Sequence, residues 1–361
     1  MTALPVAPRT SFHDVAARTA PAPPEDRGLA RDDVRLLVAT PDGLQHGRFR
    51  DLPSHLARGD LVVVNDSATL AAEFDAVLSG RGPVVVHAAS RLDDGTWVLE
   101  VRTAPDGSRA VLDAEPGAEL ALPGGDVVRL TAAYPAAGSS PTGKGTRLWQ
   151  AVVDGRVPLE RHLVRHGRPI AYGYLDQRYP LSRYQTIFAS RPGSAEMPSA
   201  ARPFSHEVVT ALVSRGIGVA TVTLHTGVSS QEAGEAPQPE WFEVSAMTAR
   251  LVAATRAEGG RVVAVGTTVT RALESAVGAD GRVTASHGWT ERVVSREDPP
   301  LVVDGLVTGW HDPLASHLLL VEAVAGPALT QQAYDVAARE GYLWHEFGDS
   351  ALLLPALRSK P

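Results

Sequence analysis

The stretch Val262-Val263-Ala264-Val265-Gly266-Thr267-Thr268 is an apolar run that ends in glycine and two hydroxyl residues, and a helical pattern follows it over 268–276. It predicts a strand, a turn and a helix in succession, which is the repeating unit of an α/β domain. Backbone N–H groups at such a helix start can receive a carboxylate, and Arg271 one turn further on could bind the same group. The more common alternative is that Thr267 or Thr268 caps the helix.

The same alternation of apolar strands and helical segments extends along most of the chain. It predicts an α/β main domain, with a mixed sheet and flanking helices. The expected strands lie at 33–39, 61–64, 217–224, 261–265 and 301–307. The expected helices lie at 158–166, 205–215, 246–258, 268–276, 315–325 and 331–339. In the first of these helices, Leu159, Leu163 and Val164 are expected to form the apolar face.

Residues 72–153 have a different texture, in which short β-rich pieces are separated by turns of glycine, proline and aspartate. Such spacing predicts a small all-β barrel or sandwich, here inserted into the α/β domain. We therefore expect the main domain to comprise residues 1–71 and 154–361, with an inserted β-barrel domain at 72–153.

Composition limits the classes of function that the chain can have. At 361 residues and 44% hydrophobic, it can bury ample core for a globular protein. The net charge of −7 gives no overall attraction to nucleic acid, although a local basic patch could still bind RNA. The absence of cysteine excludes disulfides, thiolate metal sites and cysteine nucleophiles. No leader pattern or membrane-spanning run is evident, so we expect a cytoplasmic protein with no membrane partner.

Polar residues at strand ends are the first candidates for a site. His225 comes just beyond the strand expected at 217–224, where a histidine can act as an acid, a base or a ligand contact. A hydrogen-bonded loop histidine is equally compatible with this pattern. Arg183, Tyr184 and Gln185 together offer a cation, a stacking ring and an amide that suit a nucleoside. The alternative for that run is a polar helix start that packs Tyr184 inward.

Three histidines raise the question of a metal site. His311, His317 and His345 match no familiar zinc spacing, and no carboxylate is placed convincingly beside them. We therefore expect no metal. His317 falls on the helix expected at 315–325 and is expected to face solvent or a neighbouring helix.

Taken in order, these segments resemble the S-adenosylmethionine:tRNA ribosyltransferase-isomerase family of queuosine biosynthesis over nearly the whole chain. The matching segments are His46-Gly47 to Phe49, Asp51-Leu52-Pro53, Gly59-Asp60-Leu61, Asn65-Asp66, Tyr184-Gln185-Thr186, Thr223-Leu224-His225 with Gly227, Val262 to Thr268 with Arg271 and Leu273-Glu274-Ser275, Thr308, His311, Pro313 and Gly348-Asp349. Each piece is weak by itself, and their common order and spacing carry the resemblance.

The resemblance implies a reaction as well as a fold. Members of that family transfer the ribosyl group of S-adenosylmethionine to 7-aminomethyl-7-deazaguanine in tRNA and isomerise it, which gives epoxyqueuosine and releases adenine and methionine. The sulfonium acidifies the adjacent C5′ protons, so a base starts the reaction. S-adenosylmethionine is then a co-substrate, no metal or further cofactor is needed, tRNA is a possible partner, and a monomer is favoured.

The resemblance also implies which residues form the site. The expected catalytic residues are His225, Glu240 and His311. The expected binding residues for S-adenosylmethionine or another nucleoside are Tyr184, Gln185, Thr223, Thr226, Gly227, Gly266, Thr267, Thr268, Arg271, Thr308 and Pro313.

Four of the departures from the family pattern remove an arginine or a histidine. Ala68 and Glu73 stand where the family has arginine, and Pro203 and Gln238 stand where it has histidine. These changes remove possible phosphate contacts and acid–base groups together. Two alternatives therefore accompany the parent reaction: a divergent paralogue that uses S-adenosylmethionine with a small-molecule or other non-tRNA acceptor, and a non-catalytic nucleoside-binding protein.

Overall fold

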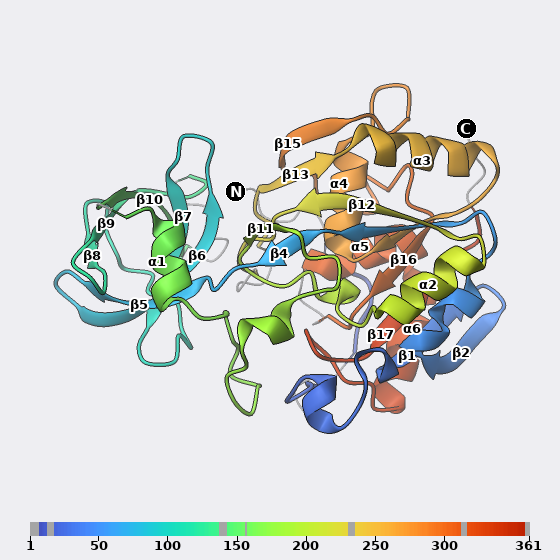
Figure 1. Ribbon diagram of the computed structural model, residues 1–361, viewed down its shortest axis with the longest axis horizontal. Coiled ribbons are helices and arrows are strands. Elements are labelled where there is room, and N and C mark those ends of the chain that lie inside the picture. The colour runs from blue at the N-terminus through green and yellow to red at the C-terminus, as the bar shows by residue number, and fades with distance from the viewer. Residues whose placement is uncertain are drawn as a thin grey trace.

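The computed structural model describes residues 7–12, 18–136, 143–155, 157–229, 235–311 and 316–357. Within these residues the chain forms a main domain built on one large sheet and a separate closed barrel (Figure 1). This architecture confirms the predicted α/β domain with a small all-β barrel. None of the described helices is both long and apolar enough to cross a membrane.

The main sheet joins nine of the described strands in the order β15-β13-β12-β3-β14-β16-β17-β1-β2. Its centre is parallel, because β3 pairs in parallel with β12 and β14, and β14 with β16. Antiparallel pairs elsewhere make the sheet mixed. The strands are β1 Arg35–Thr40, β2 Gly43–Arg48, β3 Leu61–Asn65, β12 Gly218–Leu224, β13 Glu240–Val244, β14 Val262–Val265, β15 Ser286–Thr290, β16 Gly305–Thr308 and β17 Ser350–Leu353.

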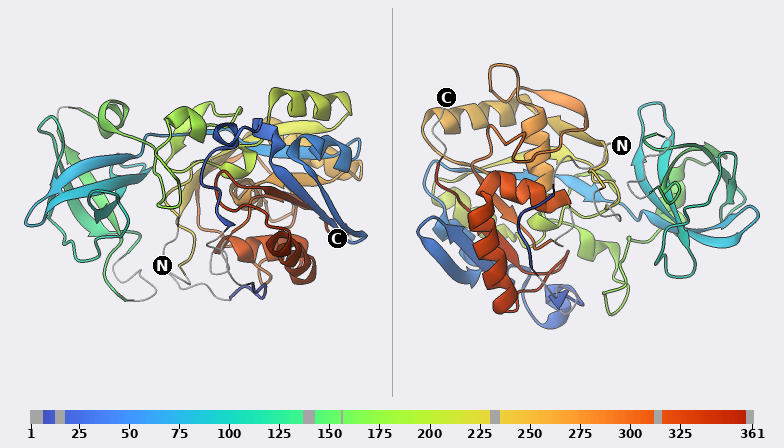
Figure 2. Two further views of the ribbon diagram at one scale, coloured as in Figure 1. Left: turned by 90° about the horizontal axis from the view of Figure 1, so that it is seen from below. Right: turned by 180° about the vertical axis from the view of Figure 1, so that it is seen from behind.

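Helices cover both faces of this sheet. Along β3 and β14, side chains alternate between two hydrophobic clusters, so that Val63 and Ala264 face one layer while Val62 and Val263 face the other. The first layer contains α3 Ala246–Ala257, α4 Thr267–Ser275, α5 Ser316–Ala325 and α6 Pro327–Arg339. The second contains α2 His206–Ser214 and the 3-10 helix η4 Phe49–His55. Figure 2 (left) shows α2 and the α5–α6 pair on opposite sides of the sheet.

The barrel closes in the order β10-β7-β6-β5-β8-β9, and each of these pairs is antiparallel. Its strands are β5 Glu73–Leu78, β6 Gly82–Arg91, β7 Trp97–Thr103, β8 Glu119–Ala121, β9 Val127–Ala133 and β10 Leu148–Asp154. Helix α1 Leu159–His166 packs on the barrel's hydrophobic cluster through Leu159 and Leu163. The exact domain boundaries stay a prediction.

The predicted apolar face of α1 was wrong in one residue. Val164 is 85% exposed, because in a helix it lies away from the face shared by Leu159 and Leu163.

Between the barrel and the main sheet, β4 Ser67–Thr69 pairs in parallel with β11 Arg191–Ser194.

The strand expected at 301–307 begins later than predicted, at Gly305. The cause is Glu274 on α4, whose carboxylate accepts the backbone N–H groups of Leu301, Val302 and Val303 at 2.8–2.9 Å. Those groups therefore bind a buried side chain rather than a neighbouring strand, although the residues are as apolar as a strand requires. Other short 3-10 helices in the described part of the chain include η2 Pro24–Arg27, η3 Arg31–Asp33, η5 Leu181–Tyr184 and η6 Ser199–Ala201.

Candidate active site

A cavity of about 350 Å³ lies at the carboxyl ends of β12, β14 and β16. Ligands of α/β proteins bind at this edge of the sheet, where loops from several strands meet. The predicted site residues that line the cavity are Thr226, Gly227, Glu240, Gly266, Thr267, Thr268, Arg271, Thr308 and His311. The structure therefore brings together nine residues that come from four separate segments of the sequence.

One end of the cavity is the N-terminus of α4. Gly266 precedes the helix with φ 91°, a left-handed conformation that favours glycine, and a Cβ there would come within 3.2 Å of Ala200. No side chain caps the helix, so the capping interpretation of Thr267 and Thr268 was wrong. Both threonines line the cavity instead. The first N–H groups of a helix have no partner within it, so this end suits an anionic group.

Beside α4, an ion pair between Arg271 and Glu240 forms part of the cavity wall. Arg271 also donates to the carbonyl oxygens of Gln238 and Thr290 at 3.0 and 3.1 Å. Glu240 accepts the N–H of Gly227 at 3.0 Å, and burial raises its pKa. Arg271 thus holds the chain segments around the cavity in place, and most of its hydrogen-bonding capacity is used by the protein.

Histidines form a second wall, and they are neutral near pH 7. His311 Nε2 lies 3.0 Å from Thr308 Oγ1, and its ring stacks on that of His317 at 4.9 Å. Burial lowers the pKa of both imidazoles, that of His317 to about 4; His317 adds to the fall at His311, and the Arg271 charge adds to the fall at His317. His317, which was expected to face solvent or a neighbouring helix, lines the cavity. No group of three ligating side chains placed to hold a metal ion occurs among the described residues.

A third wall consists of tyrosines and carboxyl groups that the sequence did not single out. The Tyr172 hydroxyl donates to Glu196, and the Tyr174 hydroxyl donates to Glu346. The two tyrosine rings stack at 5.8 Å, and Tyr174 also stacks on His345 at 4.7 Å. Burial raises the pKa of both tyrosines, so each remains a hydrogen-bond donor. The signal available in the sequence was Glu346, which lies two residues before the family-like Gly348-Asp349.

His225 does not line the cavity. Its Nδ1 lies 2.8 Å from Ser67 Oγ, and its ring stacks on Trp241 at 5.3 Å. Burial, with a smaller effect of the Arg191 charge, lowers its pKa to about 4. The imidazole is therefore neutral near pH 7 and holds β4 beside the end of β12.

Three other predicted binding residues also contact protein groups away from the cavity. Tyr184 is buried against Phe347, which is the inward packing left open from the sequence. Gln185 makes two hydrogen bonds with the backbone of Thr69, at 3.0 and 2.8 Å. Thr223 Oγ1 donates to Asp66 at 2.6 Å. Pro313 lies outside the described residues.

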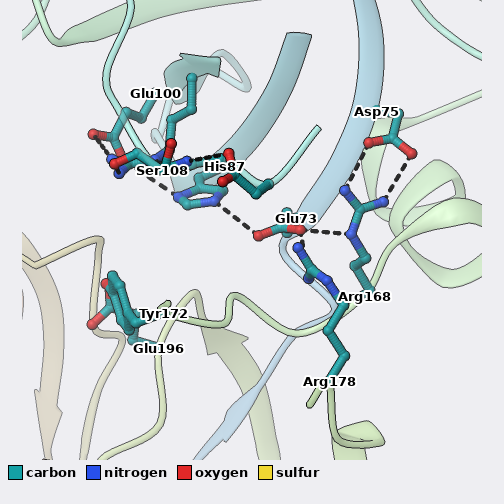
Figure 3. A network of polar contacts seen from close by, with 12 residues as sticks. Glu73, Asp75, His87, Glu100, Ser108, Arg168, Tyr172, Arg178 and Glu196 are labelled. Atoms are coloured by element: carbon teal, nitrogen blue, oxygen red, sulfur yellow. Dashed lines mark hydrogen bonds and ion pairs between the residues drawn. The ribbon is translucent and has the colours of Figure 1, made fainter. Parts of the chain in front are cut away.

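Two of the four divergent positions lie inside the protein. Glu73 is 0% exposed and binds His87, Arg168 and Arg178 where the barrel meets the main domain (Figure 3). Pro203 is buried next to Phe204 and is absent from the cavity lining.

The other two divergent positions differ from each other. Ala68 is half-buried on β4, whereas Gln238 lines the cavity beside Glu240. Of the four, only the exchange at Gln238 alters the cavity wall directly.

Comparisons with known proteins agree with this architecture. The family model described as queuosine biosynthesis protein matches residues 11–353. The S-adenosylmethionine:tRNA ribosyltransferase-isomerase of Moorella thermoacetica is 34% identical over 344 residues, which cover 90% of this chain and 94% of that protein. The protein of the same name from Gloeobacter violaceus is 35% identical over 333 residues, 90% of each chain.

A solved structure extends the comparison to three dimensions. The crystal structure of S-adenosylmethionine tRNA ribosyltransferase from Thermotoga maritima matches with a TM-score of 0.52 and 25% identity, over 96% of this chain and 99% of that one. The chain therefore belongs to the queuosine biosynthesis protein family, an enzyme family of S-adenosylmethionine:tRNA ribosyltransferase-isomerases.

Proposed function

We propose that the protein transfers and isomerises the ribosyl group of S-adenosylmethionine onto 7-aminomethyl-7-deazaguanine in tRNA, in the cytoplasm, with release of adenine and methionine. The observation that carries this proposal is the single cavity that joins the α4 N-terminus to a wall of tyrosines and carboxyl groups. S-adenosylmethionine has the matching chemistry, since it bears a carboxylate at one end and a sulfonium cation further along. Family membership supports the same substrate.

In this proposal the methionine carboxylate binds at Thr267 and Thr268, where the helix start favours negative charge. Arg271 and Glu240 keep the adjoining segments in position. Neutral His311 hydrogen-bonds with Thr308 and can exchange protons with a sugar hydroxyl. His225 acts as a positioning residue through Ser67.

The test is turnover with a defined acceptor. Purified protein and S-adenosylmethionine are mixed with tRNA that carries 7-aminomethyl-7-deazaguanine, and adenine, methionine and the nucleoside mass are measured. The matched control is the same tRNA with guanine at that position. Adenine release and a modified nucleoside with the first tRNA alone are expected, and absence of both with a protein that binds S-adenosylmethionine would overturn the proposal.

A second candidate is transfer to an acceptor that is not tRNA. It is favoured by Gln238, which replaces the family's histidine on the cavity wall, and by the carboxyl groups of Glu196 and Glu346, which oppose approach of a phosphate backbone. The same assay separates the two, because free 7-aminomethyl-7-deazaguanine would then support adenine release without tRNA. Binding of S-adenosylmethionine without turnover in any arm would instead indicate a non-catalytic protein.

A further inference from the structure

Three carboxyl groups line the cavity, and they differ in how many donors already occupy them. Glu240 is paired with Arg271 and accepts the N–H of Gly227. Glu196 accepts the Tyr172 hydroxyl together with the N–H and the hydroxyl of Ser229.

Of the three carboxyl groups, Glu346 receives the fewest donors from other described residues. One side chain, Tyr174, donates to Glu346 Oε2, and no second side chain among the described residues donates to this carboxyl group. No cation of the described chain forms an ion pair with it either. Apart from its own backbone N–H, Glu346 therefore receives a single donor from the described residues, fewer than Glu196 or Glu240 receives.

The turn that carries Glu346 holds it in a defined position. His345 has φ 69°, and it is the only non-glycine residue with positive φ among those described. Backbone strain of this kind persists where the surrounding structure enforces it, and it often occurs at functional sites. The His345 ring stacks on Tyr174, whose hydroxyl in turn binds Glu346, so side chain and backbone are fixed by the same contacts.

We propose that Glu346 is the general base that removes the C5′ proton next to the sulfonium of S-adenosylmethionine. The C–H bond breaks, its electron pair stays on C5′ beside the positive sulfur, and the proton moves to a carboxylate oxygen of Glu346. Tyr174 is a positioning residue that orients this carboxylate. The assignment rests on the proposed function, because the sulfonium is what makes the C5′ proton acidic.

The electrostatic surroundings suit this role. Burial raises the pKa of Glu346 to about 7; the Tyr174 hydrogen bond works in the opposite direction, and the negative Glu196 adds to the rise. A general base is most effective when its pKa lies near the working pH. The other titratable or charged groups on the cavity are Tyr172 before η5, Glu240 on β13, Arg271 on α4, Arg292 after β15, His311 after β16, His317 on α5 and His345 in the same turn.

The test is the pH dependence of kcat/KM for S-adenosylmethionine, which reports the ionisation of the free enzyme, measured by adenine release in the full-length protein with its acceptor. The wild type should show a rate that rises with pH around an apparent pKa near 7. Glu346→Gln should abolish this rise and lower kcat by about 10²-fold or more, the usual contribution of a general base. Glu346→Asp keeps the carboxyl group and should retain the pH-dependent rise at a lower rate.

Two neighbouring variants should shift the profile in opposite directions. Tyr174→Phe removes a hydrogen bond that favours the ionised carboxylate, so the rise should move to higher pH. Glu196→Gln removes a negative charge, so the rise should move to lower pH. A merely structural role for these residues would lower kcat without moving the profile. A primary kinetic isotope effect with 5′-dideuterated S-adenosylmethionine links the rise to C5′ proton removal.

Failure of the base assignment differs from failure of the proposed function. If the wild type releases adenine and Glu346→Gln keeps both the pH-dependent rise and a kcat within tenfold, the assignment is overturned. If the wild type is inactive with every acceptor, the proposed reaction fails. Carboxyl NMR of ¹³C-glutamate-labelled protein then tests the base itself: a resonance that titrates near 7 and disappears in Glu346→Gln is expected, and its absence would overturn the assignment.

Discussion

Individual polar side chains near the cavity fall into two groups: those whose hydrogen-bonding atoms already contact other protein groups, and those whose atoms remain available to a ligand. Most donors of Arg271 are already used, since they reach Glu240 and several backbone carbonyls. His225 uses one of its two ring nitrogens, because its Nδ1 contacts Ser67, while its ring stacks on Trp241. Removal of such a side chain leaves its protein partners without a hydrogen bond, which lowers the free energy of unfolding. This loss of stability can be measured separately from any change in the reaction rate.

The first prediction concerns His225 and pH. The folded-state pKa is lowered to about 4 from an ordinary 6.5, so between these values the unfolded chain binds a proton that the folded protein does not. Stability should therefore fall as pH drops from about 6.5 to 4. His225→Phe keeps a ring against Trp241 but cannot bind a proton, and urea unfolding at several pH values should show a shallower loss. At pH 7 the lost Ser67 contact should cost about 1 kcal/mol.

An equally steep acid dependence in His225→Phe would contradict this assignment of the titrating group. The matched control is His206→Phe, since His206 is an exposed residue at the start of α2. Its replacement should change the free energy of unfolding at pH 7 by no more than about 0.5 kcal/mol.

Residues at strand ends could be predicted from the sequence because local pattern determines them. An apolar run followed by glycine and hydroxyls marks the end of a buried strand, so Gly266, Thr267 and Thr268 were found from one short segment. Tyr172 and Glu346 had no such signal, since both lie in irregular segments that are far apart in the sequence. Their meeting at one wall depends on how the whole sheet is assembled.

The dependence of side-chain contacts on the assembled fold also explains which predictions from the sequence were wrong. Tyr184 and Gln185 were expected at a nucleoside because their side chains suit one, but the Tyr184 ring packs against Phe347 and the Gln185 amide hydrogen-bonds with the backbone of Thr69. The start of β16 was misplaced because the acceptor for the preceding backbone N–H groups is Glu274, on another element. Side-chain type indicates what a residue can bind, and only the packed fold decides what it does bind.

At the scale of elements, the turn at 343–349 positions the tyrosine–carboxyl wall. Asp349 accepts the N–H groups of Leu343 and Arg35, both at 2.8 Å, and thereby fixes the turn to β1. A Cβ on Gly348 would lie 2.4 Å from the carbonyl oxygen of Leu343 and 2.7 Å from that of Trp344. The turn therefore requires glycine at this position for steric reasons.

The second prediction follows from that close approach. Gly348→Ala should force the turn apart, destabilise the protein by about 1–3 kcal/mol and lower adenine release at least tenfold, because Glu346 moves with the turn. The matched control is Gly341→Ala, where φ is 66° but no atom lies within 4 Å of the added Cβ. That variant should cost about 1 kcal/mol from backbone strain alone and leave kcat unchanged. Equal effects of the two substitutions on kcat would contradict the proposed role of the turn.

At the scale of the whole molecule, buried charges connect the barrel to the cavity. Arg147, just before β10, binds Glu100 on β7 at 3.1 Å and Glu235 in the main domain at 2.6 Å, and it also donates to the carbonyl oxygen of Ser229. Ser229 in turn holds Glu196 on the cavity wall. Figure 3 shows the barrel side of this network, where His87 lies between Glu73 and Glu100. The barrel thus supports the site through side chains as well as through chain connectivity.

The pH response of this network follows from Glu100. Burial opposes its ionisation, but hydrogen bonding with His87 and the cations Arg147 and Arg102 outweigh burial and hold its pKa at about 2. Because the ordinary value is 4.5, its stabilising contribution is fully present above about 4.5 and is lost as pH falls toward 2. Removal of a cation raises the pKa of Glu100, so acid unfolding should then begin at a higher pH.

The third prediction compares two arginines of the barrel. Arg147→Met leaves Glu100 and Glu235 buried without this cation, and breaking such a pair typically costs about 3–5 kcal/mol. Arg129→Met removes an ion pair with Glu119 in which both side chains are about half exposed, so its effect should stay within about 0.5 kcal/mol. Urea unfolding at pH 7 measures the free-energy change of both variants, and acid titration should show unfolding at a higher pH in Arg147→Met alone.

Hydrogen exchange should also increase around Ser229 in Arg147→Met, because Arg147 holds this segment directly. If exchange increases only within the barrel, the connection between barrel and cavity is structural continuity alone, and the barrel does not position the site.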